Sequence, residues 1–387
     1  MPPEADRHSK EPSCVLILSA NMGDGHNAVA SVLRRWTLSL WPRCRVITLD
    51  TMALRGPRFA KVARAAYEQE IREAPWIYQL FFDALLEHPR FAAAAKRVVS
   101  AFFGRPLRRS VQRERPDLIL STFPLGNAAM HWLRSVAGVP VTTAAFIPGF
   151  DIHPFWTWGS VDVHFVVHPG LIADAIRFGA GGAVFTTAPL VRPGFAEVPA
   201  SSARETLGFR ADAFVVLVTG GSWGVGSIGR AIRALVRGPQ SIQVVAICGR
   251  NDRLRKDLSL AGIPRARLVT FGYVDDMPEL IQASDVVVTN GAGVTVLEAL
   301  AAGRPVIAFD PLAGHGRLAS SLLERERLGI VCPDERALVA WTMRLADGDG
   351  LGRELRANAA AMRDGPSLSE ALQHLSSLAS GDGPSGS

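Results

Sequence analysis

The chain has 387 residues, of which 48% are hydrophobic and 20% are charged, and its net charge is +6. This length exceeds one ordinary hydrophobic core and the composition excludes an intrinsically disordered chain, so we expect two globular domains. No apolar run approaches the roughly 18–20 residues that span a membrane, and the charged N-terminus does not resemble a signal peptide. The four cysteines have no paired spacing, which argues against a zinc site or a disulfide framework and fits a reducing cytoplasm.

The positive charge is concentrated in the first half of the chain. Residues 1–198 hold 22 Lys and Arg against 16 Asp and Glu, whereas the rest holds 20 of each. The excess is strongest in 55–115, with 13 basic and 6 acidic residues. Such a segment predicts an anionic partner (nucleic acid, acidic lipid or an acidic substrate) or, alternatively, an Arg-rich face in contact with solvent. Charge alone does not separate these interpretations.

The chain opens with a predicted disordered leader over 1–12, followed by a strand at Val15–Ser19. The next loop, 20–27, contains two glycines that allow the backbone to approach a ligand closely. His26 lies at the end of this loop, before a predicted helix from Ala28 to about Leu40. An imidazole there suits proton transfer, and a histidine that caps the helix is the equal alternative.

Residues 53–113 show no strand pattern and predict three helices, at 59–73, 77–87 and 91–103. Apolar and aromatic residues alternate there with arginines. The segment is either an amphipathic surface that lies on a membrane or, by default, a helical insertion that packs its apolar face on its own domain.

Alternation of strands and helices continues on both sides of this segment. In the first half, strands are predicted at 45–50, 117–121, 139–146, 161–167 and 183–187, and helices at 127–136 and 170–178. The loop after the strand at 139–146 gathers Asp151, His153 and Trp156 at the carboxyl end of a parallel strand, where open α/β sheets place ligands.

The second half repeats the pattern after a Pro-rich segment. Strands are predicted at 213–218, 243–248, 267–270, 286–289 and 305–309, and helices up to 237 and at 252–260, 276–283, 295–302, 318–328, 334–345 and 350–363. The predicted division is a leader at 1–12, a first domain at 13–190, a linker at 191–205, a second domain at 206–365, and a helix with a flexible tail at 366–387. The last helix is expected to cross back to the first domain.

The stretch from Ser284 to Gly314 predicts a phosphate site. A buried strand leads into Asn-Gly-Ala-Gly at 290–293, and a helix follows directly. A glycine turn at a helix N-terminus offers free N–H groups and the positive end of the helix dipole to an anion. Glu298, three residues after Thr295, can face the same spot from the first turn and offer a carboxylate to a sugar diol.

Several motifs occur in an order that resembles a known family. They read LSANMGDGHNAVA, FDIHPFW, VDVHFVV, GGSWGVG, AICGRND, FGYVDDM, ASDVVVTNGAGVTVLEALAAGRPVI and PLAG. They are similar to the GT-B glycosyltransferases of the monogalactosyldiacylglycerol synthase and diacylglycerol glucosyltransferase group, and to the related enzyme that adds N-acetylglucosamine to lipid-linked peptidoglycan precursor. The resemblance covers nearly the whole chain. It implies an α/β fold with two doubly wound, Rossmann-like domains that face a cleft, the first for the acceptor and membrane and the second for a UDP-sugar.

The resemblance also implies site residues. Those for the donor are Gly221, Ser222, Trp223, Gly224, Val274, Gly291, Gly293, Val294, Thr295, Glu298, Gly314 and His315. Those on the acceptor side are Gly23, Asp24, Gly25, His153 and Trp156, with His26 and Asp151 as the catalytic residues. Within the donor set, Gly221, Ser222 and 293–295 would hold phosphates, Val274 would lie against uracil, and Glu298 would bind the ribose hydroxyls.

The sequence departs from the family pattern in three respects. Gly149 stands where members commonly carry Asp, so the catalytic base is open between the nearby Asp151 and His26. His315 follows Gly314 where glutamine is usual, so the donor could be something other than UDP-galactose or UDP-glucose. The acidic and amide residues that often follow are replaced at 316–320 by Gly-Arg-Leu-Ala-Ser.

The resemblance therefore implies a UDP-sugar-dependent hexosyltransferase that acts with inversion on a lipid hydroxyl such as that of diacylglycerol. The expected partners are the UDP-sugar, this lipid and an anionic membrane surface, without nucleic acid, and the expected location is cytoplasmic, peripheral on the inner face of the cell membrane. No cofactor is expected, and no metal, because fixed dipoles could replace it and Asp275 and Asp276 are adjacent rather than spaced. Two alternatives stay open: the same chemistry on a soluble secondary metabolite, and a non-catalytic nucleotide-sugar sensor. A sugar-epimerising relative fits the first-half motifs less well.

Overall fold

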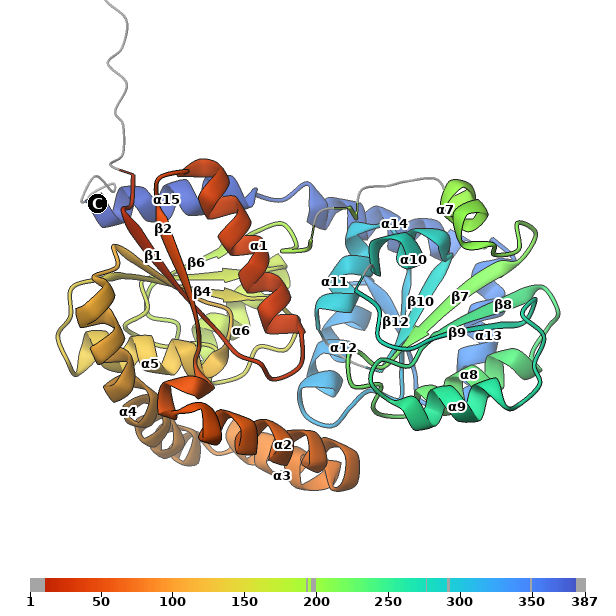
Figure 1. Ribbon diagram of the computed structural model, residues 1–387, viewed down its shortest axis with the longest axis horizontal. Helices are drawn as coiled ribbons and strands as arrows, with labels where there is room; N and C mark the ends of the chain where they lie inside the picture. The colour runs from red at the N-terminus through yellow and green to blue at the C-terminus, as the bar shows by residue number, and fades with distance from the viewer. Residues whose placement is uncertain are drawn as a thin grey trace, which may run out of the picture.

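The computed structural model describes residues 11–192, 194–195, 200–275, 277–290, 293–348 and 350–380. It contains two parallel sheets of six strands each, with helices packed around both, which confirms the predicted pair of doubly wound units (Figure 1). The N-terminal ten residues of the predicted leader, most of the predicted C-terminal tail and part of the predicted linker lie outside the described residues. The predicted domain boundaries stay predictions.

The first sheet has the strand order β2-β1-β3-β4-β5-β6. Its half of the chain consists of β1 (Cys14–Ser19), α1 (Gly25–Leu40), β2 (Arg45–Asp50), η1 (Met52–Arg55), α2 (Pro57–Glu73), α3 (Pro75–Glu87), α4 (Pro89–Glu114), β3 (Leu118–Ser121), α5 (Pro124–Ser135), β4 (Thr142–Ile147), β5 (Val163–Val166), η2 (Pro169–Leu171), α6 (Ile172–Arg177) and β6 (Ala183–Thr186). All strands of this sheet run parallel.

The second sheet has the order β12-β11-β10-β7-β8-β9 and is also parallel. Its elements are α7 (Ala200–Leu207), β7 (Phe214–Thr219), α8 (Ile228–Arg237), β8 (Ile242–Ile247), α9 (Asp252–Ser259), β9 (Leu268–Phe271), α10 (Met277–Ala283), β10 (Val286–Thr289), α11 (Val294–Ala301), β11 (Val306–Phe309), α12 (His315–Arg325), β12 (Gly329–Cys332), α13 (Glu335–Ala346), α14 (Gly350–Arg363) and α15 (Leu368–Ser380).

Helix α15 returns to the first half, as expected from the sequence. Its Leu368, Leu372 and Leu375 are buried in one cluster with Val29 and Leu33 of α1. In Figure 1 it lies beside α1 and the first sheet, at the opposite end of the molecule from α8 and α9. The burial of this apolar face ties the two ends of the chain to the same core.

Helix α4 and strand β12 are among the elements that differ from the sequence prediction. Helix α4 was expected to end at 103, before Gly104 and Pro106, but it continues to Glu114. Leu107 and Val111 are buried in the first-half core, and this burial outweighs the hydrogen bond that a proline removes from a helix. Strand β12 was not predicted, because a run of only four residues that begins with a glycine gives a weak strand signal.

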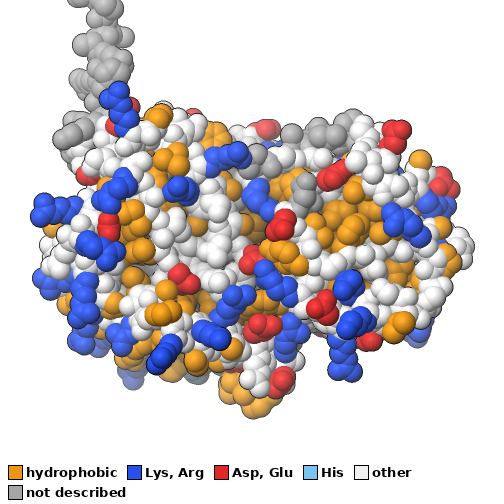
Figure 2. Space-filling model, in the orientation of Figure 1, with side chains coloured by type: hydrophobic (Ala, Val, Ile, Leu, Met, Phe, Trp, Pro, Cys, Tyr) orange, Lys and Arg blue, Asp and Glu red, His pale blue; other side chains and the backbone are white. Residues whose placement is uncertain are grey.

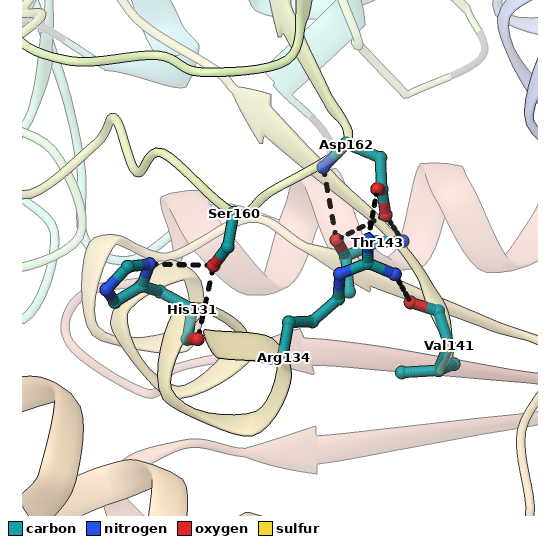
Figure 3. A network of polar contacts seen from close by, with 6 residues as sticks. All are labelled: His131, Arg134, Val141, Thr143, Ser160 and Asp162. Carbon is teal, nitrogen blue, oxygen red and sulfur yellow. Dashed lines mark hydrogen bonds and ion pairs between the residues drawn. The ribbon is translucent and has the colours of Figure 1, made fainter. Parts of the chain in front are cut away.

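A polar network lies at the N-terminal ends of β4 and β5, two inner strands of the first sheet (Figure 3). Asp162 accepts hydrogen bonds from the Thr143 N–H and hydroxyl (both 2.8 Å) and from Nη2 of Arg134 (2.7 Å). Arg134 also donates through Nη1 to the Val141 carbonyl, at 2.6 Å. The network joins α5 to the N-terminal ends of β4 and β5.

Replacement of Asp162 by Ala is expected to destabilise the fold by about 2–3 kcal/mol, because it leaves a partly buried guanidinium and a backbone N–H without their acceptor. Urea unfolding measures this change. Asp174→Ala is the matched control. Asp174 makes a long ion pair of 4.0 Å with Arg177 at the surface, so its loss is expected to lower the free energy of unfolding by less than about 0.5 kcal/mol. Equal effects of the two substitutions would contradict the prediction.

Candidate active site

The carboxyl ends of both sheets face one cleft with a volume of about 590 Å³. In the second sheet β7 lies between β8 and β10, so strand order reverses between β7 and β10. In the first sheet the corresponding point lies between β1 and β3. Ligands of open α/β sheets bind at such switch points, and the loops that follow these four strands line the cleft.

Most of the predicted site residues meet in this cleft. Those that line it are Gly23, Asp24, Gly25, His26, Asp151, His153, Trp156, Gly221, Ser222, Trp223, Val274, Gly293, Val294, Thr295, Glu298 and His315. Gly291 lies outside the described residues, and neither Gly224 nor Gly314 lines the cleft. The predicted roles of these residues stay predictions, although the structure brings them together.

The loop after β7 turns sharply because of its glycines. Gly221 has φ +71° and Gly224 has φ +57°, the left-handed region that glycine adopts without strain. A Cβ at Gly224 would lie 1.9 Å from the Cys248 carbonyl oxygen, so Gly224 packs behind the loop rather than in the cleft. This packing leaves Gly221 and Ser222 at the surface of the cleft.

Helix α11 presents its N-terminus to the cleft. Its N-cap residue is Gly293 at φ +142°, and no side chain among the described residues is seen to cap the helix. The first-turn residues Val294 and Thr295 line the cleft. Uncapped N–H groups and the positive end of the helix dipole make this spot suited to a phosphate group.

Glu298 is the fifth residue of α11, because the helix begins at Val294, one residue earlier than predicted, and it is buried. Arg192, which the sequence analysis did not single out, holds it in place. Arg192 Nη2 lies 3.1 Å from Glu298 Oε1, and Nη1 donates to the Asp275 carbonyl at 2.8 Å. Burial raises the pKa of Glu298, and the adjacent guanidinium opposes this shift. The site therefore contains a carboxylate whose charge is balanced by Arg192.

His26 lies in the first turn of α1, which begins at Gly25, three residues before the predicted helix start. Its Nδ1–H donates to the Thr122 carbonyl at 2.7 Å, which leaves the lone pair of Nε2 available. Burial lowers the pKa of His26 to about 4. The imidazole is therefore neutral at neutral pH, and its free nitrogen can accept a proton.

Asp151 lies in the loop after β4. Burial raises the pKa of its carboxyl from 3.8 to about 7. A Cβ at Gly149 would lie 2.3 Å from Asp151 Oδ1. The Asp151 carboxylate therefore occupies the space that a side chain at position 149 would need.

The loop after β4 also makes buried aromatic contacts. His153 is buried, and its ring centroid lies 5.1 Å from that of Phe82 on α3 and 6.1 Å from that of Trp156. Burial lowers the pKa of His153 to about 3, so it is also neutral. Across the cleft, burial lowers the pKa of His315 to about 4, with a smaller effect from His26. No described group of three or more His, Cys, Asp or Glu side chains is arranged to hold a metal ion.

Comparisons with known proteins agree on both halves. Residues 26–185 match the family model for monogalactosyldiacylglycerol (MGDG) synthase, and 215–347 match that for glycosyl transferases group 1. Two processive diacylglycerol beta-glucosyltransferases, of Bacillus thuringiensis (strain Al Hakam) and Bacillus cereus (strain AH187), are each 27% identical over 344 and 342 residues. Each alignment spans 87% of this chain and 86% of the relative.

Solved structures agree with the fold. UGT89C1 of Arabidopsis thaliana, complexed with UDP-L-rhamnose, superposes with a TM-score of 0.61 at 16% identity, over 96% of this chain and 100% of the other. Anabaena Alr3699/HepE in complex with UDP gives 0.54 at 14% identity, over 95% and 99%. The chain is a GT-B glycosyltransferase. It resembles the MGDG synthase and diacylglycerol glucosyltransferase group, as its motifs predicted.

This GT-B glycosyltransferase builds its cleft partly from helices that sequence analysis did not connect with the site. Tyr67 and Ile71 of α2, Tyr78, Phe81, Phe82 and Leu85 of α3, and Val99 of α4 all line the cleft. Their only signal in the sequence is an apolar pattern broken by arginines, which an ordinary packing face also produces. Their place at the site depends on how α2 and α3 fold back beneath the cleft, which no local pattern specifies.

Proposed function

We propose that this enzyme moves a hexosyl group from a UDP-sugar to the hydroxyl of a diacylglycerol-type lipid, with inversion. The observation that carries the proposal is an apolar wall that leads from the cleft to the outer surface. Phe82, Leu85 and Phe155 line the cleft on its acceptor side. Phe81 belongs to the same lining and is 43% exposed, so it marks where the wall reaches the surface.

The surface where this wall emerges is apolar and flanked by cations. Trp76, Ile77, Leu80, Phe81 and Phe91, here named the apolar patch, are exposed on α3 and α4, and α2 has no buried residue. Figure 2 shows hydrophobic side chains at the lower tip of the molecule and Lys and Arg side chains along the adjoining face of the first half. Within the described residues, no helix is both long and apolar enough to span a membrane.

The apolar patch favours a membrane-embedded acceptor over a soluble one. Exposed aromatic groups beside cations are typical of surfaces that bind the interface of an anionic bilayer. We propose that the enzyme lies on the inner face of the cell membrane through this patch and that diacylglycerol enters the cleft along the apolar wall. The relatives named as diacylglycerol beta-glucosyltransferases support the same acceptor.

The proposed reaction is a single displacement. A base takes the proton from the lipid hydroxyl, the hydroxyl oxygen bonds to the anomeric carbon of the sugar, and the bond from that carbon to the UDP oxygen breaks. The N-terminus of α11 and the Gly221–Ser222 loop are placed to stabilise the charge on the departing UDP. Asp151 is the better base at neutral pH, because its pKa of about 7 is closer to the operating pH than that of His26, about 4.

The apolar patch provides the test of acceptor delivery. Trp76→Glu with Leu80→Glu should abolish cosedimentation with vesicles of anionic phospholipid and diacylglycerol, and lower turnover on those vesicles at least tenfold, because two charges face the bilayer. Turnover on a dispersed short-chain diacylglycerol should stay within about twofold, since neither residue lines the cleft.

Val136→Glu with Leu260→Glu is the matched control. These residues are 66% and 85% exposed, outside the helices α2–α4. The control protein should bind and use the vesicles like the wild type. The proposal that the membrane delivers the acceptor would be contradicted if the patch variant kept its turnover on vesicles. It would also be contradicted if the enzyme formed product with a soluble acceptor and none with the lipid.

A further inference from the structure

Helices α2 and α3 reach from the first half to two loops of the second. In Figure 1 they extend beneath the space between the two sheets. Nη2 of Arg72 on α2 donates to the carbonyl of Trp223, at 2.9 Å, in the loop after β7. Oε1 of Gln79 on α3 accepts from the N–H of Gly314, at 2.6 Å, in the loop after β11. Each helix thus holds one of the loops that the family resemblance implies for the donor.

Aromatic rings continue these contacts inside the cleft. The ring centroid of Tyr67 lies 5.8 Å from that of Tyr78 and 5.9 Å from that of Trp223. The Tyr78 centroid lies 5.7 Å from that of His315 in an edge-to-face arrangement. Both tyrosines line the cleft beside the histidine that would reach the donor sugar. A chain of rings therefore joins α2 and α3 to both donor loops.

The contact between α3 and the second of these loops is too close to be a loose surface contact. Gly314 has φ +69°, and a Cβ on it would lie 2.5 Å from Cε1 of Tyr78. Nε2 of Gln79 donates to Oδ1 of Asp83 at 2.6 Å, which fixes the amide so that its oxygen faces Gly314. The fit at Gly314 thus depends on two side chains of the other half.

We infer that Gln79 and Tyr78 are positioning residues for the donor sugar. They hold Gly314 and His315 in the arrangement that receives the hexose, so that the sugar is bound by both halves while the nucleotide is bound by the second alone. The inference rests on the proposed function, because it takes a UDP-hexose as the donor. Helix α3 carries four of the five residues of the apolar patch, and we infer that its Tyr78 and Gln79 complete the sugar site.

The test compares binding of UDP and of UDP-glucose by calorimetry, without an acceptor. Gln79→Leu should raise the Kd for UDP-glucose about tenfold, because the Gly314 N–H loses its acceptor. The Kd for UDP should stay within about twofold. Gln79→Glu with Asp83→Asn exchanges donor and acceptor within the pair, keeps an oxygen toward Gly314 and should return UDP-glucose binding to within about threefold of the wild type.

Gln69→Leu is the matched control, since the hydrogen bond of Gln69 within the described part of the chain joins it to Glu73 of its own helix α2, at 3.1 Å. Equal Kd changes for UDP and UDP-glucose in Gln79→Leu, or no change in either, would overturn the inference. A thermal unfolding midpoint close to that of the wild type would confirm that the variant is folded. Because no lipid is present, a wrong acceptor assignment would leave this result unchanged, so the two failures are distinguishable.

Discussion

Replacement of Asp151 by Asn is expected to lower kcat about 10³-fold, because an amide cannot take the proton of the acceptor hydroxyl. The Kd for UDP should be unchanged, since the loops that we propose to bind the donor belong to the other half of the cleft. In the wild type, kcat/KM should fall tenfold per pH unit below about pH 7, where the Asp151 carboxyl becomes protonated. If His26 were the base, this fall would begin only near pH 4.

Position 149 supplies a sharper control. The Asp151 carboxylate fills the space of a side chain at 149, so Gly149→Ala in the wild type should displace it and lower kcat at least tenfold. Combining Gly149→Asp with Asp151→Gly moves the carboxylate to the position that family members commonly use, and it should restore part of the activity that Asp151→Gly alone removes. Full activity of Asp151→Asn would show that Asp151 is not the base.

Stability gives a readout of Asp151 that does not depend on turnover. Its pKa is 3.8 as an ordinary carboxyl and about 7 in the folded protein, so between these pH values the folded protein binds the proton more tightly than the unfolded chain. The free energy of unfolding therefore falls as the pH rises from about 4 to about 7. Asp151→Asn should remove this loss and raise the free energy of unfolding by about 4 kcal/mol at pH 8, with little change at pH 4. An equal effect at both pH values would contradict the burial of this charge.

Replacement of Glu298 by Ala is expected to raise the Kd for UDP about 100-fold. Glu298 is the buried carboxylate beside the α11 N-terminus, and we propose that it binds the two ribose hydroxyls. Hydrogen bonds to a charged group contribute about 1.5–3 kcal/mol each, so their loss accounts for an effect of this size. Titration calorimetry with UDP measures it, because the ribose is present without the sugar.

Because Glu298 also accepts a hydrogen bond from Arg192, the control substitution is one that retains an acceptor oxygen at this position. Glu298→Gln keeps one oxygen as an acceptor and should raise the Kd for UDP only about tenfold. Glu324→Ala, which removes an exposed carboxylate of α12, should leave UDP binding unchanged. Unaltered UDP binding in a folded Glu298→Ala protein would show that the ribose lies elsewhere.

Regular elements with strong local signals were predicted well from the sequence. Strand β10 and strand β2 begin and end where the β-branched and apolar runs indicated, and α14 has the predicted bounds. The glycine turn before α11 also predicted a helix N-terminus at the site. In these cases the local chain chemistry and the tertiary packing favour the same conformation.

Contacts between the two halves could not be predicted in this way. Arg192 meets Glu298 across 106 residues, and Gln79 meets Gly314 across 235. Nothing in the residues adjacent to either member of a pair indicates its partner, because the contact follows from how two separately folded sheets are placed. The motifs therefore indicated His26 and Asp151, which line the cleft, whereas the contact of α3 with Gly314 became evident only from the structure.

The central claim is transfer of a hexose from a UDP-sugar to a lipid hydroxyl. Its most direct test is turnover of UDP-glucose, UDP-galactose and UDP-N-acetylglucosamine with diacylglycerol in anionic vesicles, scored by the lipid-linked sugar. We expect a glycolipid product from at least one donor, with the opposite anomeric configuration to the donor, and at least 10²-fold less from Asp151→Asn. Tight UDP binding without lipid-linked product from any of these donors would contradict the claim.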